Sequence, residues 1–120
     1  MKHLIILALI VSGGYFAYVQ SAKESIVVDS YQALLQKVEV EPVTLAEVKL
    51  GAEFLANRFC NDTDFQGTSG SSVSACLEKL NNFGGMCMSR VFDGAPETFN
   101  SKDQVVAKAK HYASCTGSTG

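Results

Sequence analysis

The four cysteines of this chain constrain its fold more than any other feature of the sequence. Cys60, Cys76, Cys87 and Cys115 follow an apolar N-terminal segment that has the order of an export signal. Outside the reducing cytosol, an even number of cysteines usually forms disulfides. No C-x-x-C pair occurs, so neither a redox dithiol nor a zinc site is indicated. The sequence therefore predicts a small exported domain with two disulfides.

The order of the expected helices favours one of the three possible pairings of these cysteines. Cys60 ends one expected helix and Cys76 begins the next, so an antiparallel hairpin would bring them together. This favours Cys60–Cys76 together with Cys87–Cys115. Pairing of Cys60 with Cys115, at two helix ends, is the main alternative, and sequence alone leaves all three connectivities open.

Residues 1–22 have the order of a signal peptide. Lys2 supplies a positive charge, Leu4–Val11 is an unbroken apolar run, and Ser12–Gly14 interrupts it before small residues and a polar stretch. This order predicts cleavage near Ala22, although the cleavage motif is imperfect. The alternative is an uncleaved N-terminal anchor, for which the apolar stretch is shorter than the ~20 residues that usually span a bilayer.

Cleavage would leave residues 23–120 as one helical domain with a modest core that disulfides reinforce. The 12 acidic residues exceed the 10 basic ones, and both signs are mixed along the chain. Without a basic stripe, a nucleic-acid partner is not expected. The polar tail at residues 116–120 is expected to fray.

Apolar side chains recur with helical spacing through most of this domain. We expect helices or short helical elements over residues 23–38, 44–60, 73–83, 86–93 and 100–114, with a strand as the alternative for residues 86–93. Gly84 and Gly85 are expected to end the third of these helices. The predicted fold is therefore all-α, a small bundle of four to five short helices with antiparallel hairpins, stapled by two disulfides.

Two local patterns add detail to the helix assignments. Thr44 with Glu47, and Ser101 with Gln104, have the spacing of a capping box at a helix start. Gly51 lies in the middle of the helix over residues 44–60, where glycine costs ~1 kcal/mol against alanine. We expect a glycine at position 51 because a neighbouring helix packs closely against this position.

Residues 61–72 are the longest polar stretch and are expected to form a loop. Loops held on rigid scaffolds often carry contacts, so we take this one as the candidate partner-binding site. Phe65 in this loop either packs back on the core or stands out as an anchor. The candidate partner-binding residues are Asp62, Asp64, Phe65 and Gln66.

Catalytic chemistry has little support in the sequence. His111 and Cys115 lie four residues apart on a helix and could form half of a metal site or a nucleophile pair. The simpler interpretation is a histidine favoured by the helix dipole beside a disulfide. We therefore predict no catalytic residue, no metal site and no cofactor.

These observations favour a non-enzymatic, protein-binding domain of the bacterial cell envelope, periplasmic or secreted, and similar in kind to an inhibitor or immunity protein. Its partner would be a protein of unknown identity, and contact with a membrane is expected only if residues 1–22 stay attached. One alternative is a structural subunit of an envelope assembly, anchored in the inner membrane. A weaker alternative is an enzyme or metal-binding protein that uses His111.

Overall fold

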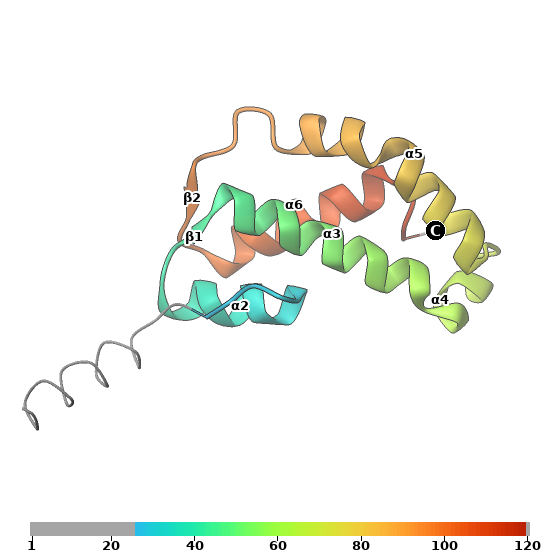
Figure 1. The fold of residues 1–120 in the computed structure, drawn as a ribbon, viewed down its shortest axis with the longest axis horizontal. Coiled ribbons are helices and arrows are strands. Elements are labelled where there is room, and N and C mark those ends of the chain that lie inside the picture. The colour runs from blue at the N-terminus through green and yellow to red at the C-terminus, as the bar shows by residue number, and fades with distance from the viewer. Residues whose placement is uncertain (1–25, 120) are drawn as a thin grey trace, which may run out of the picture.

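The computed structural model describes residues 26–119, so the predicted leader at residues 1–22 lies outside the described range. The described chain forms five helices and one pair of two-residue strands (Figure 1). In chain order these elements are α2 Tyr31–Val40, β1 Val43–Thr44, α3 Leu45–Asn61, α4 Thr63–Thr68, α5 Val73–Val91, β2 Thr98–Phe99 and α6 Lys102–Cys115. The all-α fold with two disulfides is confirmed.

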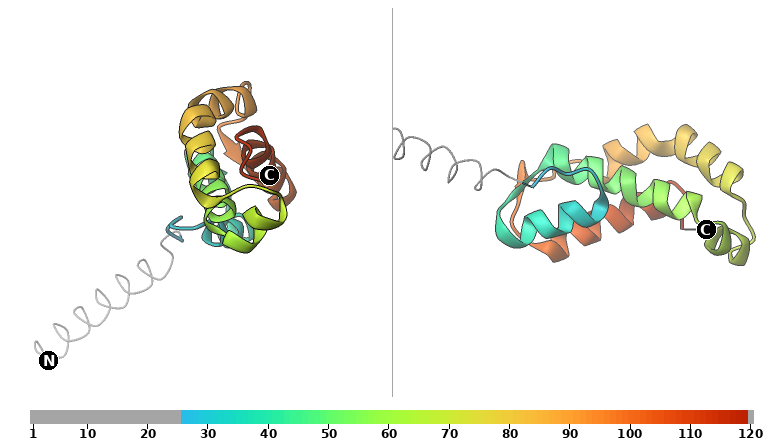
Figure 2. Two further views of the ribbon diagram at one scale, coloured as in Figure 1. Left: turned by 90° about the vertical axis from the view of Figure 1, so that its right-hand side faces the viewer. Right: turned by 60° about the horizontal axis from the view of Figure 1, so that its bottom comes forward.

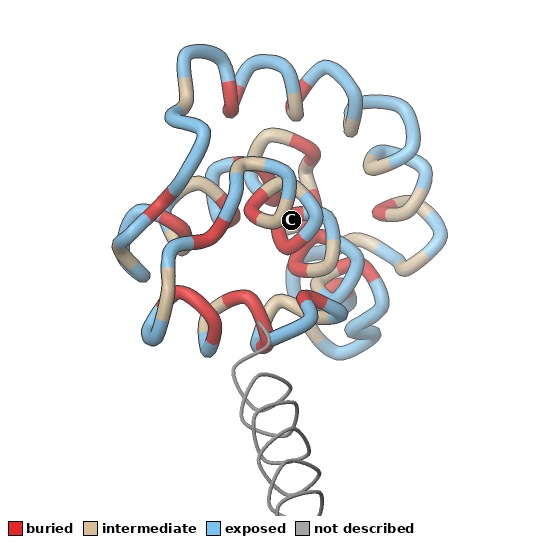
Figure 3. The backbone as a smooth tube through the Cα atoms, turned by 60° about the vertical axis from the view of Figure 1, so that its left-hand side comes forward, coloured by how far each residue is buried: buried red, intermediate tan, exposed pale blue. Residues whose placement is uncertain are grey.

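Helix α3 is the centre of the bundle. It packs along α6, and α2 and α5 lie on opposite sides of this pair (Figures 1 and 2). The inward sides of α2, α3 and α6 carry most of the buried residues, whereas α5 is exposed over most of its length (Figure 3). Apolar side chains with no exposed surface make up the centre of the core, among them Leu34, Val43, Val48, Ala52, Val105 and Ala109.

The start of α3 has the predicted capping box. The Thr44 hydroxyl accepts a hydrogen bond from the backbone N–H of Glu47 at 3.2 Å, and the Glu47 carboxylate accepts one from the backbone N–H of Thr44 at 3.0 Å. The same carboxylate pairs with Lys37 of α2, whose side chain is almost fully buried. Glu47 therefore both caps α3 and fastens α2 to its first turn.

A pH dependence follows from this arrangement. Burial raises the pKa of Glu47, but the hydrogen bonds and charge of Lys37 and the hydrogen bonds of Thr44 outweigh burial and hold the pKa below its ordinary value of 4.5. A lowered folded-state pKa adds stability above the unfolded pKa, and this stability is lost as the pH falls through the folded pKa. Acid should therefore weaken the contact between α2 and α3.

We expect Glu47→Gln to lower the free energy of unfolding by about 1 kcal/mol at pH 7, because glutamine keeps the capping box and loses only the charge. The difference from wild type should shrink in urea titrations below about pH 4.5, as wild-type Glu47 becomes protonated. The control is Glu39→Gln, whose partner Lys102 is half exposed. This change should cost only a few tenths of a kcal/mol at any pH. A constant penalty for Glu47→Gln down to pH 2 would contradict this account.

Gly51 is where α2 and α3 approach each other, as the sequence predicts. A Cβ at Gly51 would overlap the tip of the Leu34 side chain, which has no exposed surface. Overpacking of this kind typically costs about 1–3 kcal/mol, more than the gain in helix propensity. Gly51 is thus a packing residue.

We therefore expect Gly51→Ala to destabilise the protein by about 1–2 kcal/mol in thermal or urea unfolding. The matched control is Gly85→Ala in α5, where a Cβ would meet no atom within 4 Å. This second change should stabilise the protein by about 0.5–1 kcal/mol because it removes only the helix cost of glycine. Equal effects of the two substitutions would show that Leu34 does not confine position 51.

Helix α5 corrects the prediction that Gly84 and Gly85 end a helix. The helix runs without interruption from Val73 to Val91. It therefore includes the separate short helix expected over residues 86–93, except for residues 92 and 93. Each glycine costs about 1 kcal/mol, which the disulfides at Cys76 and Cys87 outweigh by fixing both ends of the segment. At its end, Lys108 of α6 donates a hydrogen bond to the Val91 carbonyl at 2.8 Å.

Residues 61–72 are not simply a loop, because they contain the short helix α4. Asp62 is its N-cap, and the carboxylate accepts a hydrogen bond from the backbone N–H of Phe65 at 3.0 Å. An aspartate three residues before the bonded N–H is a normal N-cap pattern, which the polar composition of the stretch obscures. The irregular part is reduced to the turn around Gly70.

Both ends of the described chain differ from the expected boundaries. The expected helix over residues 23–38 begins only at Tyr31, where the Ser30 hydroxyl accepts a hydrogen bond from the backbone N–H of Ala33 at 3.0 Å, and it continues to Val40. Residues 26–30 precede the helix. The β-branched residues at its expected start disfavour helix.

The C-terminal tail, for which fraying was predicted, forms a hydrogen-bonded turn over residues 116–119 in the structure. Gly117 has a φ of +78°, and the backbone N–H groups of Gly117 and Ser118 bond to the carbonyls of Ser114 and Ala113, at 3.1 and 2.9 Å, which closes α6 with a Schellman motif. Ser118 is buried as a result. At the other end of α6, the side chain of Ser101 makes no capping hydrogen bond, so the second predicted capping box is wrong.

Candidate functional site

The disulfides pair as the hairpin argument favours. Cys60 at the end of α3 bonds to Cys76 in α5, and Cys87 of α5 bonds to Cys115 at the end of α6. Their Cα–Cα separations are 5.2 and 5.7 Å, within the usual range for a disulfide. The two bridges therefore tie α5 to the bundle at two points, one on each neighbouring helix.

Between the two bridges, α5 is presented at the surface. None of the residues at positions 77–86 is buried, and the buried residues of the whole helix are Cys76, Cys87 and Val91. Phe83 and Met86 are both 46% exposed. An apolar residue that the fold does not bury is available for contact with another molecule.

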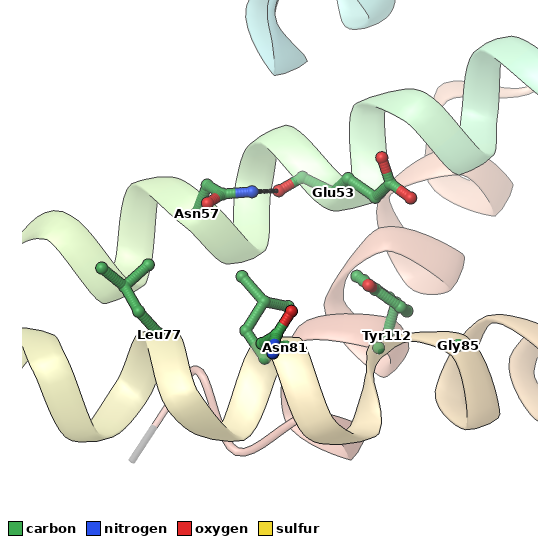
Figure 4. Close-up of a pocket in the computed structure, with 8 residues that line it drawn as sticks. Glu53, Asn57, Leu77, Asn81, Gly85 and Tyr112 are labelled. Carbon is green, nitrogen blue, oxygen red and sulfur yellow. Dashed lines mark hydrogen bonds between the residues drawn. The ribbon is translucent and has the colours of Figure 1, made fainter.

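A groove lies between this part of α5 and the bundle (Figure 4). It has a volume of about 350 Å³ and is open to solvent. Its lining comes from three helices: Glu53 and Asn57 of α3, Leu77, Leu80, Asn81, Gly84 and Gly85 of α5, and Tyr112 of α6. In Figure 4 Leu77 points from α5 toward α3, the side chains of Glu53 and Asn57 lie along α3, and Tyr112 lies between the two helices. The α5 residues recur at intervals of three and four, so they share one face of the helix.

The electrostatics of the groove are negative. Glu53 is the one charged residue in its lining. Burial raises the pKa of Tyr112, and the negative charge of Glu53 raises it further. The two ion pairs within residues 26–119 are Lys37–Glu47 and Lys102–Glu39, so Glu53 takes part in no ion pair in the described part of the chain.

The structure places the residues of the predicted loop site in different environments. Asp62 and Asp64 are exposed, but Asp62 has a structural role as the N-cap of α4. Phe65 is partly buried with its ring centroid 5.1 Å from that of Phe59, so it packs back on α3 and does not stand out as an anchor. Of these three residues, Asp64 alone remains as an exposed polar side chain to which no structural role is assigned.

Gln66 is the clearest departure from the predicted site. Its side chain is 1% exposed, and its amide donates to the carbonyls of Phe59 and Ser118, at 2.8 and 2.9 Å. The residue therefore joins α4 to the end of α3 and to the C-terminal tail. It does not lie on a surface that a partner could contact. No sequence pattern indicated this burial, because glutamine is usually exposed.

His111 lies on the exposed side of α6, where it lines a separate hollow that Phe99 and Lys108 also border. Its neighbour Cys115 is held in a disulfide and offers no thiolate in the oxidised protein. Among residues 26–119, no group of three or more His, Cys, Asp or Glu side chains is placed to hold a metal ion. Over the same range, no helix combines the length and apolar character needed to cross a membrane.

The groove was not found from the sequence, because it depends on how three helices meet. Gly84 and Gly85 are predicted to end a helix, and only the structure shows that Gly85 lies inside α5 with no atom within 4 Å of the position of a Cβ. No family model, curated protein or solved structure matches the chain. The function is therefore argued from the residues themselves.

Proposed function

We propose that the protein is a small exported domain of the bacterial cell envelope that binds a protein partner and catalyses no reaction. One observation carries the proposal: α5 is fastened at both ends by disulfides, yet none of the residues at positions 77–86 is buried. A helix that contributes so little to the core, and is nevertheless held firmly in place, is suited to presenting a surface.

Physical chemistry supports this use of α5. Binding is opposed by the entropy lost when flexible groups become ordered, and a helix that is already fixed loses less. Phe83 and Met86 add exposed apolar area on one side of α5, and the groove opens on another. Aromatic residues and methionine are enriched at the centres of protein interfaces. The contact surface proposed here is therefore α5, in place of the stretch at residues 61–72.

The proposed location rests on the disulfides and on the predicted leader. Disulfides persist in the periplasm or outside the cell, where a domain of this kind can act as an inhibitor or immunity protein. If residues 1–22 remain attached, the same domain becomes a structural subunit held at the inner membrane. The N-terminal residue of the protein purified from its host distinguishes the two, and Met1 from membrane fractions would favour the anchored form.

The binding role is tested by photo-crosslinking in the host. A photoreactive phenylalanine analogue is placed at Phe83 in α5, with a control at Gln36, which is exposed on α2 on the other side of the bundle. We expect a discrete crosslinked protein adduct from position 83 and none from position 36. Identical adducts at both positions, or none at either, would count against a partner on α5.

A further inference from the structure

We infer that the groove between α3, α5 and α6 receives an arginine side chain of the partner protein. This inference deepens the proposed function and depends on it, because it assigns chemistry to one part of the contact surface. It rests on the charge of the groove, on its hydrogen-bonding groups and on its walls. These three observations come from different residues.

The polar side chains of the groove are one carboxylate, Glu53, two amides, Asn57 and Asn81, and the Tyr112 hydroxyl. The Glu53 carboxylate carries the charge and has no partner cation within residues 26–119. The amide nitrogen of Asn57 already donates to the backbone carbonyl of Glu53 at 2.9 Å, which leaves its side-chain oxygen as the free group. A positively charged ligand with several N–H donors is complementary to the Glu53 carboxylate and the Asn57 oxygen, both of which are exposed. The guanidinium group has five N–H donors and a permanent charge.

The walls of the groove suit the rest of an arginine side chain. Leu77 and Leu80 are partly exposed and offer apolar surface to an aliphatic stem, which basic side chains commonly bury. Tyr112, which is only 2% exposed, closes the inner side of the groove between α3 and α5 (Figure 4). The volume of about 350 Å³ is at the small end for a ligand pocket, as expected for one side chain.

The glycine pair in α5 fits the same account. Gly84 lies close to Tyr112, because a Cβ there would be 3.1 Å from the tyrosine hydroxyl. Gly85 has no such neighbour, yet it lines the groove. Since glycine in a helix costs about 1 kcal/mol, its presence at position 85 is explained by the open space that it leaves in the groove.

The first test uses a capped pentapeptide, acetyl-Gly-Gly-Arg-Gly-Gly-amide, and ¹H–¹⁵N correlation spectra of the full disulfide-bonded protein. We expect shifts confined to the groove residues, with a Kd on the order of millimolar, as for a single side chain. The peptide with neutral citrulline in place of arginine should give no such shifts. Shifts of equal size with citrulline, or none in the groove with arginine, would overturn the inference.

Two pairs of variants locate the site. Glu53→Gln should weaken arginine-peptide binding about fivefold, whereas Glu78→Gln, an exposed acid of α5 outside the groove, should leave it unchanged. Gly85→Met should also weaken it at least fivefold while raising the melting temperature, because methionine fills the groove and favours helix. Asn82→Met, elsewhere on α5, is its control. Unchanged binding in Glu53→Gln or Gly85→Met would contradict the inference.

Failure of this inference is distinguishable from failure of the proposed function. If position 83 crosslinks a protein equally well in wild type and in Glu53→Gln, the partner exists but the groove is not its contact, and the inference is wrong. Reduced crosslinking in Glu53→Gln but not in Glu78→Gln supports the inference.

Spermidine is the probe that tests whether the groove binds a small-molecule cation. Tighter binding of spermidine than of the arginine peptide would assign the groove to a free polyamine, and the inference that it receives an arginine side chain of a protein would be wrong.

Discussion

Replacement of all four cysteines by alanine is expected to leave the protein largely unfolded at 37 °C. The bridges close loops with sequence separations of 16 and 28 residues. On chain-entropy grounds each contributes about 3 kcal/mol, so their joint loss removes about 6 kcal/mol. Small domains have a total stability of only about 5–15 kcal/mol, and this one leaves α5 with few buried residues to hold it. Far-UV circular dichroism melts, with and without a reducing agent, measure the effect.

The two bridges can be separated by double variants. Cys60→Ala with Cys76→Ala should retain a cooperative transition with a loss of about 3 kcal/mol. Cys87→Ala with Cys115→Ala should lose about 0.5 kcal/mol more, because its loop is longer. Removal of either bridge should also release one end of α5. A fourfold variant that melts within a few degrees of wild type would show that the core alone holds the fold.

Local patterns in the sequence predicted the parts of the fold that short-range interactions determine. The capping box at Thr44 and Glu47 is present because its two hydrogen bonds involve residues three apart. The close contact at Gly51 was also predictable, since a glycine inside a helix with strong apolar spacing requires a reason. The disulfide pairing followed from the order of the helices on either side of Cys60 and Cys76.

The predictions that the structure corrects concern residues whose conformation or burial depends on contacts with distant parts of the chain. Gly84 and Gly85 stop an isolated helix, but here the bridge from Cys87 to α6 holds the helix beyond them. Burial of Gln66 depends on the carbonyl of Ser118, which lies 52 residues away. The groove joins Glu53 to Tyr112 across a similar distance in the sequence. No local pattern encodes contacts of this kind.

The pairing of β1 with β2 is a further contact that the sequence analysis did not find. Two-residue strands give no alternating pattern, yet they bring Phe99 opposite Val43 and tie the segment between α5 and α6 to the start of α3. Phe99 is 2% exposed, and Val43 has no exposed surface. The core therefore extends to this end of the bundle through a phenylalanine that lies outside every helix.

Phe99→Ala should consequently be the most damaging single substitution in this part of the core, with a loss of about 3–5 kcal/mol in urea unfolding. The loss combines the apolar area removed from the core with the cavity left beside Val43, which the short strands cannot close. Phe83→Ala is the matched control, because it makes the same chemical change at a side chain that is 46% exposed, and it should cost less than about 1 kcal/mol. If the two variants lose equal stability, the end of the bundle at β1 and β2 does not belong to the core, and the role assigned here to Phe99 is wrong.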